Sequence, residues 1–166
     1  MVPGMFIITV YLLFSMLLVL WLDTTRYIIP NWLSGSLLAL YPIALLLARH
    51  PVDWQLALAG MFFVLAIGYF IFSRRWMGGG DIKLITVASL WVGWQNLVEY
   101  LFDVTLLGGA LSVALLFGRK WGAPYLQRDG KPLPRILRNG EPVPYGIAIA
   151  VGFLIMVWLG KIPAIR

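Results

Sequence analysis

The stretch RRWMGGGDIKL, residues 74–84, separates two apolar segments of this 166-residue chain. It places three consecutive glycines and a carboxylate at the start of a hydrophobic segment. Working outward from it, apolar segments of similar length occur at roughly 5–22, 31–48, 55–73, 82–97, 103–118 and 143–160. Each is close to the length with which an α-helix crosses the hydrocarbon core of a bilayer. The pattern predicts an all-α fold, a polytopic membrane bundle of about six transmembrane helices.

Composition supports this fold class and limits the chemistry. Hydrophobic residues make up 61% of the chain and charged residues only 12%, which excludes an ordinary soluble domain. Six spans joined by short loops occupy the whole length, so we expect a single transmembrane domain over residues 1–166. The absence of cysteine excludes disulfides, thiolate metal ligands and cysteine nucleophiles. His50 is the single histidine and lies in a loop away from any cluster of acids, so we expect no metal site.

The boundary between the fourth and fifth helices is marked only weakly. Residues 82–118 form one apolar stretch interrupted by VEYLFD, residues 98–103. Its two acids, Glu99 and Asp103, predict the turn between the two helices. A re-entrant pair of helices is the alternative at this place.

The distribution of Lys and Arg predicts the orientation in the membrane, because positively charged loops stay on the cytoplasmic side. The first, third and fifth loops of a six-helix chain share one side and carry ten of the thirteen basic residues: Arg26, Arg74, Arg75, Lys83, Arg119, Lys120, Arg128, Lys131, Arg135 and Arg138. We therefore expect a multi-pass protein of the cytoplasmic (inner) membrane with both termini outside. The basic, proline-broken fifth loop is expected to contact anionic lipid head groups and not nucleic acid.

Two of the seven acids stand apart from the rest. Asp23 closes the first predicted helix, in LDTTRYIIPNWL, and Asp81 opens the fourth. The expected topology places both at the cytoplasmic boundary of the membrane. Each has a structural interpretation, Asp81 as a helix N-cap and Asp23 as a solvated residue beside Arg26. Together they favour a functional interpretation, because ionisable groups at membrane depth are costly.

Two carboxyl groups at one depth indicate aspartic-protease chemistry. Neighbouring carboxylates cannot both ionise easily, so one serves as a base toward water and the other as an acid toward the scissile carbonyl. The helix dipole predicts that Asp81 holds the charge more often and acts first as base, because it lies at a helix N-terminus and Asp23 at a C-terminus. Gly78, Gly79 and Gly80 are expected to shape the loop and let an extended peptide approach Asp81.

These residues also carry a family resemblance. MGGGDIKL contains a GxGD pattern at residues 78–81, DTTRYIIPNWL resembles the segment around the first aspartate of the type IV prepilin leader peptidases, and VPYGIAIAVG is similar to the entrance of their last helix. The chain most resembles the short class that serves Flp or tight-adherence pili. The resemblance implies an endopeptidase that cuts a basic leader from a prepilin at the cytoplasmic membrane face. Its partners are the prepilin and the lipid bilayer, and it needs no metal or organic cofactor.

The chain also departs from the long members of that family. Those members carry an N-terminal cytoplasmic domain with cysteine pairs, which is linked to N-methylation of the pilin. This chain has no cysteine, and we do not expect it to methylate. The alternatives are a small ion channel or transporter that uses the same acids, or a noncatalytic membrane scaffold. The absence of an internal repeat, and of acids deeper within the predicted spans, argues against transport.

Overall fold

The computed structural model describes residues 3–122, 124, 126, 133–138 and 140–165. Within these ranges the chain is helical and has no strand, which confirms the all-α prediction. Six helices of more than ten residues form the bundle: α1 (Pro3–Arg26), α2 (Asn31–Leu47), α3 (Trp54–Ser73), α4 (Gly79–Val92), α5 (Trp94–Phe117) and α7 (Tyr145–Trp158). Three short turns complete the described elements: η1 (Gly118–Gly122), η2 (Arg135–Leu137) and η3 (Pro163–Ile165).

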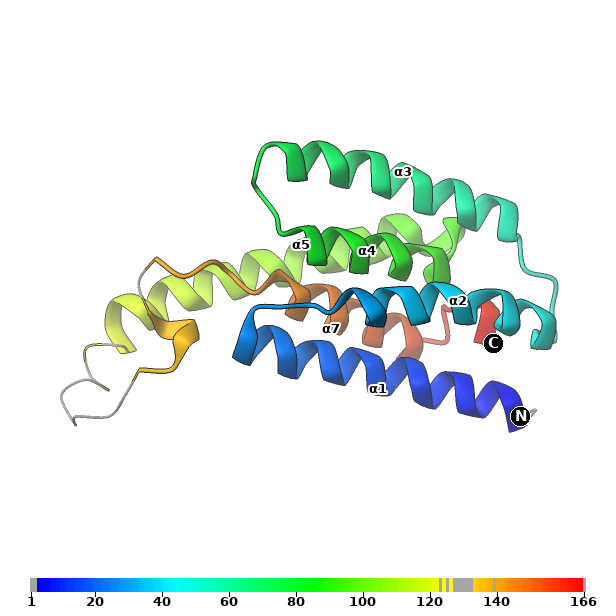
Figure 1. The fold of residues 1–166 in the computed structure, drawn as a ribbon, viewed down its shortest axis with the longest axis horizontal. Helices are drawn as coiled ribbons and strands as arrows, with labels where there is room; N and C mark the ends of the chain where they lie inside the picture. The colour runs from blue at the N-terminus through cyan, green and yellow to red at the C-terminus, as the bar shows by residue number, and fades with distance from the viewer. Residues whose placement is uncertain (1–2, 123, 125, 127–132, 139, 166) are drawn as a thin grey trace.

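Helices α4 and α7 form the centre of the bundle (Figure 1). Helix α4 packs against α2, α3, α5 and α7, and α7 packs against α1, α4 and α5. Small residues in α7 allow this close approach: a Cβ atom added at Gly152 would lie 2.9 Å from Cγ2 of Val104 in α5. On α4, the indole of Trp91 is fully buried and donates a hydrogen bond of 3.1 Å to the carbonyl of Leu37. The central helices are therefore held by close packing on several sides.

The helices differ in length in a way that matters for the membrane. Helices α1 and α3, and the helical run Trp94–Gly122, are long and apolar enough to cross a bilayer. Helices α4 and α7 have 14 residues each, which corresponds to about 21 Å against a hydrocarbon core of about 30 Å. The outer helices present large apolar side chains to the surroundings, as a lipid-facing surface requires, and the two short central helices begin at the wall of the cavity described below.

Successive helices run in opposite directions, so the connections gather at two ends (Figure 1). The links around 27–30 and 74–78, and the described residues 118–122 and 140–144, lie at one end, which we call the cavity end. Residues 48–53, Gly93 and 159–165 lie at the other, which we call the far end, together with the start of α1. The described parts of the first, third and fifth loops therefore lie at the same end of the bundle. Which end faces the cytoplasm stays a prediction.

The predicted turn at Glu99 and Asp103 is wrong. Helix α4 ends at Val92, and α5 begins at Trp94, so a single residue joins them. That residue is Gly93, whose backbone angles (φ 74°, ψ 165°) are open essentially only to glycine. The two helices pack against each other as an antiparallel pair.

Both acids of VEYLFD consequently lie inside α5. Glu99 stays at the far end, where Lys161 pairs with it. Asp103 stands half-buried in the third turn of α5. The expectation that no acid lies deeper in the spans, which counted against transport, does not hold for Asp103.

Candidate active site

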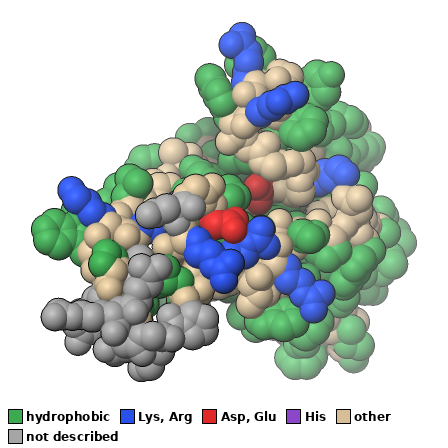
Figure 2. All heavy atoms as spheres, turned by 60° about the vertical axis from the view of Figure 1, so that its left-hand side comes forward, with side chains coloured by type: hydrophobic (Ala, Val, Ile, Leu, Met, Phe, Trp, Pro, Cys, Tyr) green, Lys and Arg blue, Asp and Glu red, His purple; other side chains and the backbone are tan. Residues whose placement is uncertain are grey.

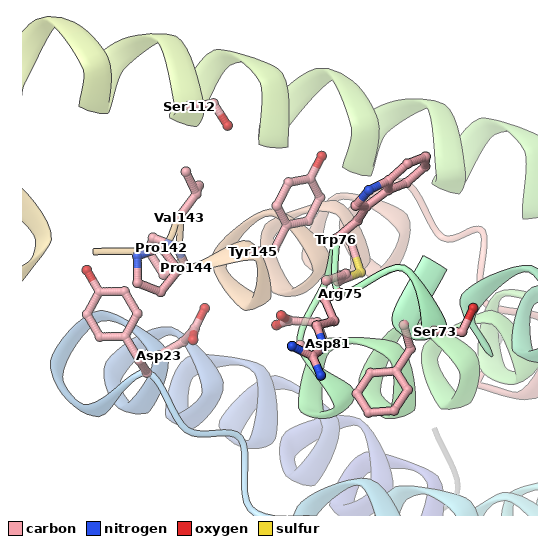
Figure 3. A pocket seen from close by; sticks show the side chains of 14 residues that line it. Asp23, Ser73, Arg75, Trp76, Asp81, Ser112, Pro142, Val143, Pro144 and Tyr145 are labelled. Atoms are coloured by element: carbon pink, nitrogen blue, oxygen red, sulfur yellow. The ribbon is translucent and has the colours of Figure 1, made fainter. Parts of the chain in front are cut away.

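A cavity of about 880 Å³ opens at the cavity end of the bundle. Asp23 and Asp81 both line it, although 57 residues lie between them in the chain. Residues of the α3–α4 link, among them Trp76, form part of its wall. The segment Pro142–Tyr145 at the start of α7 forms another part. In Figure 3 the side chains of Asp23 and Asp81 extend from α1 and α4 toward the same space. The fold therefore brings Asp23 and Asp81 to one cavity.

Asp23 belongs to the last turn of α1 and faces inward. Only 4% of its surface is exposed, and its Oδ2 atom has no hydrogen-bond partner among the described residues. The guanidinium of Arg26, expected as a surface partner, lies instead 5.7 Å from the ring centroid of Trp21. Asp23 is therefore not a solvated residue at a helix end. A buried carboxyl oxygen without a partner is costly in a protein that has no use for it.

Asp81 is the third residue of α4 and approaches the cavity from the other side. The N-cap position of α4 is held by Gly78, so Asp81 is not the N-cap residue itself. A Cβ atom added at Gly78 would lie 3.0 Å from Oδ2 of Asp81, tighter than most real contacts. Lys83 takes no part in this arrangement, because its Nζ donates to Oδ1 of Asn31 at 2.8 Å. Among the described residues, no basic side chain forms an ion pair with the Asp81 carboxyl group.

The N-terminus of α7 completes the site. The backbone amide of Gly146 lies against both carboxyl groups, and that of Ile147 lies against Asp23. A Cβ atom added at Gly146 would be 2.7 Å from Oδ2 of Asp23, so a side chain does not fit here. Since the first amides of a helix carry partial positive charge, the starts of α4 and α7 both favour negative charge in the cavity.

Sequence reasoning gave Gly146 no role in the site. Its sequence signal was the PYG stretch, in which Pro144 directly precedes an apolar helix and a glycine stands in the first turn. Pro144 is the N-cap residue of α7, and Gly146 is the second residue of the helix. The stretch by itself indicates only a resemblance, because nothing local shows which side chains meet the start of a helix.

The three glycines at 78–80 serve close packing. A Cβ atom at Gly80 would lie 3.3 Å from Cβ of Ile29, and one at Gly79 would lie 3.3 Å from Cε2 of Phe72. None of the three glycines has a positive φ angle. Gly80 allows α4 to approach the α1–α2 link closely, Gly79 allows it to approach Phe72 of α3, and of the three glycines only Gly78 lines the cavity.

Backbone strain is concentrated around this cavity. Within the described ranges, the non-glycine residues with a positive φ angle are Tyr27 (57°) and Arg75 (58°), and both line the cavity. Each follows the end of a helix at a position where glycine is the usual residue. Strained residues of this kind gather at binding and catalytic sites.

Basic side chains surround the entrance. Figure 2 shows Lys and Arg side chains at this end of the molecule, with acidic atoms exposed among them and within the hollow. Arg119 donates hydrogen bonds to the carbonyls of Ile136 and Pro142, at 3.1 and 3.3 Å. It therefore ties the fifth loop to the end of α5 and fixes the segment that enters α7.

Comparisons with known proteins show what the chain is similar to. Residues 10–113 match the profile of the type IV leader peptidase family, a range that contains Asp23, Asp81 and the three glycines but not Gly146. A prepilin leader peptidase/N-methyltransferase of Aeromonas hydrophila is 27% identical over 90 residues, which is 52% of this chain and 24% of that protein. The match thus spans about a quarter of the relative's length. No solved structure matches the chain.

Proposed function

We propose, from the premise that the chain belongs to the type IV leader peptidase family, that it is a membrane-embedded aspartic endopeptidase. Its substrates would be type IV prepilins of the Flp kind, from which it removes the basic leader peptide at the cytoplasmic face of the inner membrane. The observation that carries this proposal is the pair Asp23 and Asp81, which α1 and α4 bring into one cavity.

The chemistry follows from two carboxyl groups that share a cavity. One carboxylate takes a proton from a water molecule as that water attacks the scissile carbonyl carbon, and the other carboxyl group donates a proton to the developing oxyanion. In the second half of the reaction the roles reverse, and the leaving amine takes up a proton. The partnerless Oδ2 of Asp23 provides an acceptor for this exchange.

The cavity walls suit an extended peptide. Met77 and Gly78 lie in the link before α4, and Pro142 and Val143 in the segment before α7, and all four line the cavity. Both segments are non-helical, so a substrate backbone can lie between them without displacing a helix. A leader that arrives from the aqueous side and a hydrophobic segment that continues along the bundle would place the scissile bond near the two carboxyl groups.

The roles of the two aspartates are also part of the proposal. Asp81 lies in the first turn of α4 and would act first as base. The start of α7 also faces Asp23 and favours negative charge there. The two aspartates therefore differ less in their preference for the charged form than the ends of α1 and α4 alone would imply. Infrared spectroscopy of the carboxyl groups, with each aspartate replaced in turn, measures which one carries the proton. A protonated Asp81 beside an ionised Asp23 contradicts this assignment.

The main test is cleavage by the reconstituted protein. We expect Asp23→Asn and Asp81→Asn each to lower kcat for a prepilin at least about 100-fold, because each removes a group that transfers protons. Asp103→Asn is the matched control, since it makes the same change at a half-buried acid in α5 that does not line the cavity.

Two results would contradict the proposal. Cleavage that survives both cavity substitutions excludes the proposed pair. A wild-type protein that cleaves no candidate prepilin, but conducts ions in a manner that depends on the same two aspartates, favours the channel or transporter.

A further inference from the structure

We propose that Tyr27 and Glu141 form a subsite for a basic side chain of the leader peptide, and that Arg135 of this chain occupies the subsite until substrate binds. This inference rests on the proposed function. It adds which residues recognise the leader and how the entrance is covered in the free protein.

The geometry is that of a binding site for a cation. Nε of Arg135 lies 3.0 Å from Oε1 of Glu141, and its guanidinium carbon lies 4.8 Å from the ring centroid of Tyr27. A carboxylate beside an aromatic face is a combination that binds guanidinium and ammonium groups. Its present occupant is a side chain of the same chain.

The subsite adjoins the cavity. Tyr27 lines the cavity four residues after Asp23, and Glu141 directly precedes Pro142, which also lines it. A peptide whose scissile bond lies between the two aspartates can therefore extend a side chain to Tyr27 and Glu141. Among the described residues at this end, Glu141 is the acid that remains outside the aspartate pair.

The backbone of Tyr27 is held in a strained conformation. A φ angle of 57° is unfavourable for a bulky aromatic residue and persists only where the surrounding structure imposes it. Burial raises the pKa of the Tyr27 phenol above its usual value, so the ring stays neutral and presents its face to a cation. The strained position thus keeps an aromatic surface at the edge of the cavity.

Arg135 is placed so that another cation can replace it. Its side chain is 47% exposed and that of Glu141 is 23% exposed, and ion pairs this accessible to water are weak. Arg119 holds the carbonyls of Ile136 and Pro142 on either side of the pair. Glu141 can therefore stay in position while the Arg135 side chain turns away and a basic side chain of the substrate takes its place.

The test compares two substrates that differ in the leader. One is a prepilin with its basic leader residues intact, and the other carries glutamine in their place. We expect wild type to show a KM about fivefold lower for the basic leader. Glu141→Gln should remove this difference with little change in kcat, and Tyr27→Leu should reduce it. Tyr27→Phe keeps the aromatic face and should retain the preference.

The role of Arg135 has its own prediction. Arg135→Gln removes the competing side chain and should lower KM for the basic leader about threefold, without changing KM for the glutamine leader. Arg138→Gln is the matched control, because it removes a positive charge from the same loop but not from the subsite. An equal decrease of KM in Arg138→Gln would show a general charge effect and overturn the assignment of Arg135.

A binding measurement separates this inference from the proposed function. A synthetic leader peptide with Lys and Arg, and its glutamine counterpart, are titrated into wild type and Glu141→Gln in lipid nanodiscs. Tighter binding of the basic peptide that depends on Glu141 supports the subsite even if no prepilin is cleaved. Equal preference in both proteins overturns it, whether or not the protein is a peptidase. Thermal unfolding of each variant, with Glu141→Asp as a second substitution that keeps the charge, excludes a folding defect.

Discussion

The two ends of the bundle differ in the pairing of their acidic side chains and in which residues have a positive φ angle. At the far end, Glu99 is paired with Lys161, and Asn96 donates to the carbonyl of Lys161 at 2.8 Å. At the cavity end, neither Asp23 nor Asp81 takes part in an ion pair within the described part of the chain, and Asp23 is almost fully buried. The far end pairs the acid Glu99, whereas the cavity end leaves the two aspartates of the cavity without an ion pair among the described residues.

Helix ends show the same contrast. Helix α7 ends at the far end with Gly160 in the left-handed region (φ 66°), and Gly93 provides the other positive φ angle there. Helices α1 and α3 end at the cavity end with Tyr27 and Arg75 in the same region, where a side chain is unfavourable. The difference indicates that the far end is optimised for stability and the cavity end for presenting side chains to a cavity.

The largest effect is expected where α7 meets the aspartates. In Gly146→Ala the new Cβ atom would lie 2.7 Å from Oδ2 of Asp23, so the carboxyl group or the helix must shift. We expect a loss of prepilin cleavage of about 100-fold, because a shift of about 1 Å is enough to misalign reacting groups. Gly109→Ala in α5, where the added Cβ meets nothing within 4 Å, is the control. Normal cleavage by Gly146→Ala would show that α7 does not position the pair.

A substitution at Gly93 should change stability and not catalysis. Gly93→Ala forces a side chain into backbone angles that only glycine adopts readily, at a cost of about 1–3 kcal/mol. Equilibrium unfolding in mixed micelles measures the decrease in the free energy of unfolding. The kcat of the folded fraction should match wild type, and a large decrease in kcat would break the separation between the two ends.

Replacing a strained residue at the cavity end should increase stability, whereas Gly93→Ala decreases it. Arg75→Gly removes an unfavourable left-handed residue at the end of α3 and should raise the free energy of unfolding by up to about 1 kcal/mol. Arg74→Gly, at the neighbouring residue with φ −85°, should lower it. If both substitutions destabilise equally, the conformation of Arg75 is not strained.

The smallest effect is expected at the exposed ion pair of the far end. Glu99→Gln removes the partner of Lys161, and both side chains are more than a third exposed (43% and 35%). We expect a decrease in the free energy of unfolding of about 0.5 kcal/mol or less, with cleavage unchanged. A loss greater than about 2 kcal/mol would mean that the pair is structurally important and would contradict its description as a weak surface ion pair.

The helices themselves could be predicted from the sequence, because hydropathy is a local property. The first three segments, at 5–22, 31–48 and 55–73, agree with α1, α2 and α3 to within a few residues. The predicted fourth and fifth segments differ from α4 and α5, because the acids of VEYLFD indicate a loop by composition, whereas the turn lies at Gly93 in a stretch without charge. Glu99 is exposed on α5 and pairs there with Lys161, which is distant in sequence.

What the sequence by itself determined about this protein is an all-α membrane bundle with Asp23 and Asp81 at helix ends and basic residues concentrated in alternate loops. Only the tertiary structure decided that the two carboxyl groups share a cavity, that the start of α7 faces them through Gly146, and that Arg135 covers Glu141 and Tyr27. The physical reason is that helix formation depends on neighbouring residues, whereas the meeting of side chains depends on how whole helices pack. Side-chain volumes at contacts such as Gly80 with Ile29 control that packing, and they act between residues far apart in the chain.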